Sequence, residues 1–155
     1  MSIFLNPQRR YCGSLREEHI GQRVTVCGWC ARMRDLGGLI FIDLRDREGI
    51  VQCVFDEADN KELFDLAFTV RSEYTLKIEG VVRQRSSIND KIPTGRIEIL
   101  ADSLEIYEKA DTPPFEISDE ATVNDALRLK YRYLDLRRPS LQKSLALRHK
   151  IAHVA

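Results

Sequence analysis

Cys27 and Cys30 have the two-residue gap that zinc knuckles and redox pairs use. The segment around them is rich in valine and predicts a β-strand, in which residues three apart point to opposite faces. The other two cysteines, Cys12 and Cys53, are isolated and do not form a second pair that would complete a zinc site. We therefore expect four reduced, structural cysteines and no metal site, with zinc or redox chemistry as the alternative.

His149 and His153 lie one helical turn apart, but the residues between them are Lys-Ile-Ala, without the glutamate that a zinc-protease motif requires. Elsewhere the sequence has no nucleophile with a nearby base, no Walker-type glycine loop and no convergent pair of carboxylates. We expect no catalytic residue in this chain.

Phe41 is the aromatic residue whose position most clearly suggests a binding role. Side chains in a strand alternate between two faces, so Ile40 and Ile42 on the inner face put Phe41 on the wetter one. A ring there either belongs to a satellite cluster under a loop or forms a platform on which an unpaired base stacks. Spacing alone leaves both interpretations open.

Polar residues on other predicted strands share that outer face, because each alternates with apolar neighbours: Gln52, Lys77, Glu79, Arg83, Arg85 and Glu98. An aromatic ring, an amide, arginines and a carboxylate provide a stacking surface, hydrogen-bonding groups for base edges and partners for phosphates. The alternative is that an exposed strand face is polar in any case, and that Glu98 simply pairs with an arginine.

The elements that must position these residues are short. Five runs rich in valine, isoleucine and aromatic residues predict strands: residues 23–33, 38–43, 49–55, 74–85 and 95–107. Residues 60–71 have apolar side chains at helical spacing behind Asp59, which predicts one short capped helix. The order of three strands, a helix and two strands predicts an all-β fold, the five-stranded Greek-key barrel called the OB-fold, which binds oligonucleotides across one sheet face.

The charge of the chain changes sign along its C-terminal third. Residues 102–125 carry eight acids and one lysine around Thr112-Pro113-Pro114, whereas residues 128–150 carry eight bases and one acid. The acidic stretch predicts a semi-rigid linker. The basic stretch is either a solvated helical face or a contact surface for RNA or for the linker. Ser140 is expected to cap a final helix, which Ala155 truncates.

These observations divide the chain into a barrel at residues 1–108, a proline-containing hinge at 109–127 and the start of a second domain at 128–155. With 24 basic and 24 acidic residues, nucleic-acid binding would depend on local clustering of charge. No run approaches the roughly 18 apolar residues of a membrane span, and the N-terminus lacks the apolar core of a signal peptide. We expect a cytoplasmic protein.

Several stretches resemble one family, the bacterial-type aspartyl-tRNA synthetases, which are class II enzymes. The matching stretches are Tyr11-Cys12-Gly13, Gly28-Trp29, residues 34–52, residues 80–83, Thr94-Gly95, Ile97-Glu98 and residues 128–139. The block Tyr133-Leu134-Asp135-Leu136 also suits the lysyl relatives, whereas the run around Phe41 and Arg137-Arg138-Pro139 indicate the aspartyl branch.

The resemblance implies an N-terminal OB barrel that grips the anticodon loop of tRNA(Asp), a hinge, and the start of a class II catalytic domain. That domain would join aspartate to tRNA through an aspartyl-adenylate, with ATP and Mg²⁺, in a cytoplasmic homodimer. Its ATP and aspartate motifs are expected beyond Ala155, so the chain alone should be inactive. The anticodon-binding residues that the resemblance implies are Arg34, Phe41, Gln52, Arg85, Glu98 and, as a weaker loop candidate, Asn89.

Some residues depart from the family pattern. Met33 and Ala31 stand where polar residues are common, Cys30 replaces a common valine, and Arg96 replaces a frequent acid. A lost charge at Met33 removes one possible phosphate contact. In this family a histidine in place of Leu36 accompanies enzymes that also charge the asparagine tRNA, so Leu36 indicates an aspartate-only enzyme.

Two other functions remain open. A free-standing OB protein that coats single strands would bind without sequence preference. A structural or oligomerising domain would not bind RNA.

Overall fold

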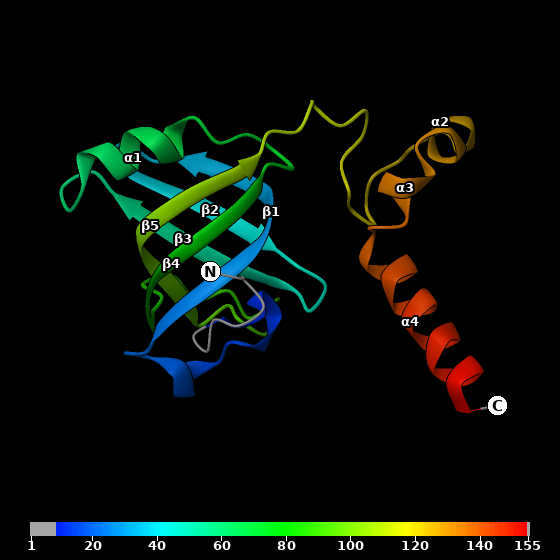
Figure 1. Cartoon of the computed structure of the whole chain (residues 1–155), viewed down its shortest axis with the longest axis horizontal. Coiled ribbons are helices and arrows are strands. Elements are labelled where there is room, and N and C mark those ends of the chain that lie inside the picture. Colours follow the sequence, from blue (N-terminus) through cyan, green and yellow to red (C-terminus); the bar gives the residue numbers. More distant parts are fainter. Residues whose placement is uncertain (1–8, 155) are drawn as a thin grey trace. The chain divides into compact units, whose positions relative to one another are not determined.

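The computed structural model describes residues 9–154. The chain divides into two compact units, Met1–Thr112 and Pro113–Ala155, and the described part of the first holds the sheet while that of the second is helical (Figure 1). The strands are β1 (Arg23–Asp35), β2 (Leu39–Arg45), β3 (Ile50–Asp56), β4 (Thr75–Gln84) and β5 (Ile97–Glu108).

The five strands form a closed barrel in the order β1-β2-β3-β5-β4. All neighbouring pairs are antiparallel except β3 and β5, which pair in parallel through Cys53 opposite Ile99 and Val54 opposite Leu100. Together with the helix between β3 and β4, this arrangement confirms the predicted OB-fold.

The strand limits differ from the prediction at several ends. β1 and β2 each run two residues further than expected, to Asp35 and Arg45. After Asp35 the chain reverses within three residues and β2 begins at Leu39. Gly37 and Gly38 make this turn with φ angles of 69° and 86°, which glycine adopts at little cost. The turn puts Arg34 directly opposite Phe41 in the β1–β2 register.

Helix α1 (Lys61–Phe68) lies across one end of the barrel (Figure 1). The cap predicted at Asp59 is wrong by one residue, since the Asn60 side chain accepts the hydrogen bond from the Leu63 N–H at 3.0 Å. Asn60 has an extended backbone, as N-cap residues do, and its short amide reaches the third helical N–H.

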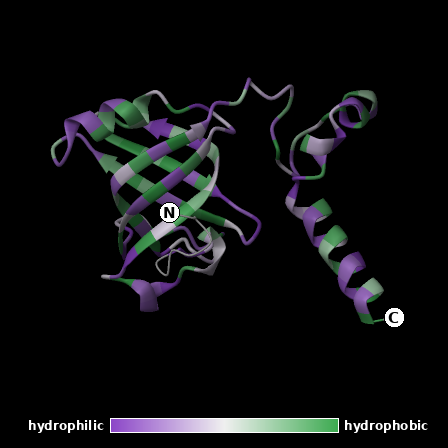
Figure 2. Cartoon of the chain, viewed as in Figure 1, coloured by the Kyte–Doolittle hydropathy of each residue, from purple (hydrophilic) through white to green (hydrophobic). Residues whose placement is uncertain are grey.

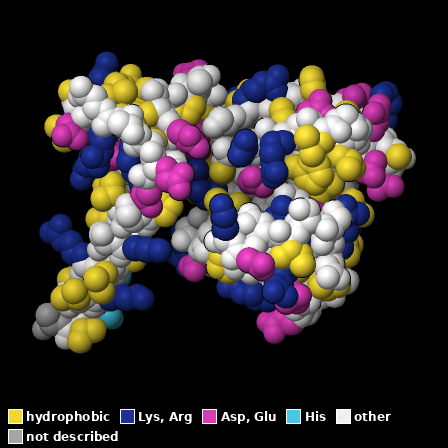
Figure 3. All heavy atoms as spheres, turned by 180° about the vertical axis from the view of Figure 1, so that it is seen from behind, with side chains coloured by type: hydrophobic (Ala, Val, Ile, Leu, Met, Phe, Trp, Pro, Cys, Tyr) yellow, Lys and Arg dark blue, Asp and Glu magenta, His cyan; other side chains and the backbone are white. Residues whose placement is uncertain are grey.

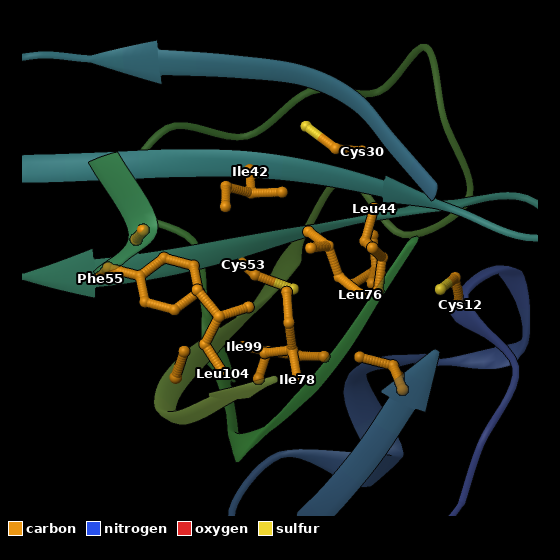
Figure 4. Close-up of a cluster of buried hydrophobic side chains, with 14 of the residues drawn as sticks. Cys12, Cys30, Ile42, Leu44, Cys53, Phe55, Leu76, Ile78, Ile99 and Leu104 are labelled. Carbon is orange, nitrogen blue, oxygen red and sulfur yellow. The ribbon is translucent and has the colours of Figure 1, made fainter. Parts of the chain in front are cut away.

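The core fills the inside of the barrel with apolar side chains from every strand. Bands of hydrophobic and hydrophilic residues alternate along the strands in Figure 2, as expected for strands with one buried face. Figure 4 shows a close-up of the cluster, with ten of its residues labelled: Cys12, Cys30, Ile42, Leu44, Cys53, Phe55, Leu76, Ile78, Ile99 and Leu104.

The N-terminal segment packs closely on the turn between β2 and β3. Two short 3-10 helices, η2 (Cys12–Ser14) and η3 (Glu17–His19), precede β1. The Cys12 N–H donates to the Asp46 carboxylate at 2.6 Å. A side chain at Gly13 would meet the Glu48 carbonyl oxygen at 1.9 Å, so only glycine permits this contact.

The second unit contains α2 (Asp125–Lys130), α3 (Arg132–Asp135) and α4 (Pro139–Val154). Ser140 lies inside the first turn of α4, so its prediction as the cap is wrong. Asp119 takes that role, because its carboxylate accepts both the Ser140 N–H at 3.1 Å and the Ser140 hydroxyl at 2.6 Å.

Part of the basic stretch is not a solvated face. Asp135 is fully buried, and atoms of Arg128, Arg132 and Arg138 each lie 3.0 Å from its carboxylate oxygens. Three of the bases therefore stabilise one buried carboxylate within the second unit. Among residues 9–154, no helix is long and apolar enough to cross a membrane.

Candidate nucleic-acid interface

A chain of hydrogen-bonded polar side chains crosses the outside of the barrel, with one residue from each strand. We call it the polar network; its members, in order of contact, are Asp43, Arg34, Gln52, Glu98 and Arg83. Strand pairing explains the order, since Gln52 lies opposite Asp43 in the β2–β3 register and Arg83 lies opposite Glu98 in the β4–β5 register.

Arg34 lies near one end of the polar network, between Asp43 and Gln52. Its Nη2 atom lies 3.0 and 3.2 Å from the two Asp43 carboxylate oxygens and 3.1 Å from the Gln52 Oε1 atom. Its Nε atom is buried and has no hydrogen-bond partner among the described residues. About a third of the side chain is exposed, so the guanidinium has both fixed contacts and an accessible surface.

Gln52 joins the two charged ends. Its Oε1 accepts from Arg34, and its Nε2 donates to Glu98 Oε2 at 2.7 Å. Arginine offers only donors and a carboxylate only acceptors, so the opposite orientation of the amide would create two repulsive contacts. The neighbours therefore hold the Gln52 amide in one orientation.

Glu98 is a buried carboxylate whose two oxygens are both hydrogen-bonded. Oε2 accepts from Gln52, and Oε1 accepts from the Arg83 Nε at 2.8 Å. Gln52 and Glu98 are each only 4% exposed, so they lie under the surface of the face on which strand alternation puts them. The pairing of Glu98 with an arginine, considered from the sequence alone, is present.

Phe41 is half-buried and lies outside the core cluster, in contrast to Phe55, which is fully buried on β3. The Arg34 guanidinium carbon lies 5.7 Å from the centre of the Phe41 ring, within the range of a cation–π contact. An aromatic ring and an arginine thus share the outer surface of β1 and β2.

The other two predicted site residues are not joined to this group by any hydrogen bond or ion pair in the described part of the chain. The Arg85 Nε is buried without a hydrogen-bond partner, just beyond the end of β4. Asn89 lies in the loop between β4 and β5, where its side chain accepts the Lys91 N–H at 3.1 Å. Its amide therefore shapes the loop.

Lys77 and Glu79 lie on the same outer face of β4 as Arg83, as strand parity predicts, because Leu76, Ile78 and Val82 between them are buried, but they form no hydrogen bond with the polar network in the described part of the chain. Lys77 instead contacts Glu79 at 3.0 Å and Glu105 at 3.4 Å, and its hydrogen bond lowers the pKa of Glu79. These charges neutralise one another.

The cysteine pair lies on two sides of β1. Cys27 is half-buried, while Cys30 is fully buried in the core, and burial raises the pKa of the Cys30 thiol to about 12. In residues 9–154 no group of three or more His, Cys, Asp or Glu residues could hold a metal ion.

Sequence reasoning placed Arg83 on the outer face but did not select it or Asp43 for the candidate site. The available signal was their alternation with apolar neighbours. Lys77 and Glu79 show the same alternation without belonging to the polar network, so the signal does not single out Arg83. Figure 3 shows acidic and basic side chains interspersed on one side of the molecule, without a large field of a single sign. Recognition here would depend on local geometry.

Comparison with known proteins agrees with the OB-fold of the barrel. The model of the family described as OB-fold nucleic acid binding domain, of tRNA anticodon type, matches residues 24–107. An aspartate–tRNA ligase of Clostridium novyi (strain NT) is 51% identical over 99% of this chain and 26% of its own length. An aspartate–tRNA(Asp/Asn) ligase of Thermoanaerobacter sp. (strain X514) is 56% identical over 92% of this chain and 24% of its own length.

Among solved structures, asparaginyl-tRNA synthetase from Pyrococcus horikoshii, complexed with asparaginyl-adenylate, matches with a TM-score of 0.72 and 28% identity. The match covers 86% of this chain and 30% of that one. The chain spans about a quarter of the length of the curated relatives it matches. Because the family model covers more than half of its residues, this chain belongs to the tRNA anticodon-binding family of OB-fold nucleic acid binding domains.

Proposed function

We propose that this chain is the anticodon-binding part of an aspartate–tRNA ligase and that it holds the anticodon loop of tRNA(Asp) against Phe41 and the polar network. The observation that carries the proposal is identity of about one half with aspartate–tRNA ligases over nearly the whole chain. The half-buried Phe41 beside an arginine supports the same function, because bases of single strands stack on exposed aromatic rings.

Within this proposal, Phe41 stacks on an anticodon base, and Arg34 and Arg85 donate hydrogen bonds to the RNA. Gln52 and Glu98 take part through their small exposed edges and by orienting the two arginines of the polar network. Asn89 contributes from the loop between β4 and β5.

The whole protein would attach aspartate to tRNA through an aspartyl-adenylate, with ATP and Mg²⁺, as a cytoplasmic homodimer. Residues 109–127 would form the hinge and residues 128–155 the start of the catalytic domain. We assign no residue of this chain to ATP or Mg²⁺. Aspartate-dependent exchange of pyrophosphate into ATP, measured with the purified chain, should therefore be absent. Detectable exchange would contradict the assignment of aspartate activation to the rest of the enzyme.

The proposal is tested by comparing four ligands: the aspartate and asparagine anticodon stem-loops, the same stem with a scrambled loop, and an oligo-pyrimidine DNA. We expect the aspartate stem-loop to bind most tightly, with the asparagine stem-loop weaker if Leu36 limits the chain to aspartate. Equal affinity for the DNA would favour a coating protein, and no binding to any RNA would favour a structural domain.

A further inference from the structure

We propose that Arg83, which is not among the predicted site residues, binds a phosphate of the RNA backbone with its two terminal nitrogens while Glu98 holds it in position. This inference rests on the proposed anticodon-binding function and adds a residue to it. Arg83 lies on β4 at the end of the polar network opposite to Arg34.

The first argument is the way in which Arg83 is anchored. Its Nε donates to Glu98 Oε1 at 2.8 Å, and Glu98 is buried and fixed on its other side by Gln52. In the described part of the chain, Nη1 and Nη2 of Arg83 donate no hydrogen bond, although 43% of the side chain is exposed. The end of the guanidinium is therefore both oriented and available.

Arg23 provides a comparison on the same barrel. Its side chain is equally exposed, at 45%, and also pairs with a carboxylate, that of Asp102. There, however, both terminal nitrogens donate to the two oxygens of Asp102, and Nη2 also lies 3.6 Å from Glu79. The two terminal nitrogens of Arg23 are thus occupied by Asp102, whereas those of Arg83 are available to a ligand.

A phosphate is the ligand that this arrangement fits. The paired terminal nitrogens of an arginine match two oxygens of a phosphate, and contacts to phosphate and sugar are the most frequent in nucleic-acid complexes. Within the polar network the charges of Arg34 and Arg83 are balanced by Asp43 and Glu98, so Arg85, just beyond the end of β4, adds a positive charge that no carboxylate of the network neutralises. RNA that stacks on Phe41 would bring its backbone past these strands.

The experiment measures the affinity of the chain for the aspartate anticodon stem-loop at several salt concentrations, with Arg83→Gln and the matched control Arg23→Gln. We expect Arg83→Gln to weaken binding roughly tenfold or more, as for loss of a charge-assisted hydrogen bond. The loss should be the same for stem-loops with changed anticodon bases, and the slope of log affinity against log salt should fall by about 0.7. Arg23→Gln should change neither quantity.

Glu98→Gln adds a test of positioning. If Glu98 acts through Arg83, the double variant Arg83→Gln/Glu98→Gln should bind much more tightly than the product of the two single losses predicts. Additive losses would contradict a positioning role. Thermal melts of each variant show whether the fold is retained. Arg83→Lys provides a second test if Arg83→Gln does not fold. Because lysine keeps the charge, this variant should keep the wild-type slope of log affinity against log salt.

Three results would overturn the proposal. Arg83→Gln with wild-type affinity and slope would show that Arg83 does not touch the RNA. A loss confined to one anticodon base would show that it reads a base instead of a phosphate. A changed slope in Arg83→Lys would show that the effect is not one of charge. If the wild-type chain prefers the aspartate stem-loop in each case, the anticodon-binding function stands and only the role of Arg83 fails.

Discussion

Gln52 on β3 donates a hydrogen bond of 2.7 Å to Glu98 on β5, beside the parallel pairing that closes the barrel. Both side chains are almost fully buried although they lie on the outer face of their strands. The same contact therefore joins β3 to β5 and links the two arginines of the polar network.

Replacement of Gln52 by leucine should destabilise the fold by about 1–3 kcal/mol, because the buried Glu98 carboxylate loses one of its two partners. The free energy of unfolding, from urea titration followed by circular dichroism, measures this cost. Gln84→Leu is the control, since Gln84 is exposed at the end of β4 and should change stability by less than about 0.5 kcal/mol. Equal stability of the Gln52 variant and the wild type would show that the polar network does not support the barrel.

A second buried pair lies at the C-terminal end of β2. Arg45 Nη2 donates to both carboxylate oxygens of Glu73, at 2.9 and 2.8 Å, and the side chains are 13% and 6% exposed. Glu73→Gln should therefore cost about 3–5 kcal/mol of stability, because it leaves a buried guanidinium without its counter-ion.

The surface pair Arg47–Glu48, with side chains 68% and 49% exposed, is the control for that experiment. Glu48→Gln should cost less than about 1 kcal/mol. Similar losses from the two glutamate variants would mean that burial does not determine the contribution of these ion pairs.

Acid should unfold the second unit locally. The Arg128 hydrogen bond, together with the charges of Arg128, Arg138 and Arg132, lowers the pKa of Asp135 from its ordinary value of 3.8. A carboxylate with a lowered folded pKa stabilises the fold above its unfolded pKa, and this contribution is lost as the pH falls through the folded pKa. We expect NMR signals of α2 and α3 to lose their dispersion below about pH 4.

Asp135→Asn should remove this pH dependence, and Asp125→Asn, at a carboxylate 88% exposed, should leave it unchanged. If α2 and α3 in the Asp135 variant still lose structure over the same pH range, another carboxylate is responsible.

The four thiols should differ in reactivity. Burial raises the pKa of all four thiols, but Cys12, Cys30 and Cys53 are fully buried, whereas Cys27 is only half-buried and the charges of Arg9 and Lys77 oppose the rise in its pKa. Only the thiolate attacks iodoacetamide, so at pH 8 the native protein should be alkylated at Cys27 first. Peptide mass spectrometry identifies the site, and denatured protein should react at all four. Earlier modification of Cys30 would contradict its place in the core.

Local patterns were sufficient to predict most of the barrel. The alternation of Ile40, Phe41 and Ile42 has period two, which fixes the face of each side chain without knowledge of the partner strand. The cap of α1 was predicted one residue early because Asp59 and Asn60 are both good caps, and only the backbone geometry distinguishes them.

The burial of Gln52 and Glu98 could not be predicted, because the two residues are 46 positions apart and meet only when β3 and β5 pair in parallel. For the same reason the ion pair of Arg45 with Glu73, 28 positions apart, left no signal in the sequence. The three arginines around Asp135 lie within seven residues of it, but charge counting does not show which bases of the run turn inward to one carboxylate. Strand parity treats an outer face as wet, whereas long neighbouring side chains can cover the shorter polar ones.

The proposed stacking of Phe41 on an anticodon base is tested most directly by two measurements on the same samples: thermal melts and titrations with the aspartate anticodon stem-loop. Phe41→Ala should weaken binding by roughly 1–3 kcal/mol, the usual loss of one base-aromatic stack, and Phe41→Tyr should retain most of the affinity. The melting temperature of both variants should change little, whereas the core control Phe55→Ala should lose about 3–5 kcal/mol of stability. A Phe41→Ala protein that melts far earlier, yet binds the stem-loop normally while folded, would contradict the assignment of Phe41 as the anticodon platform.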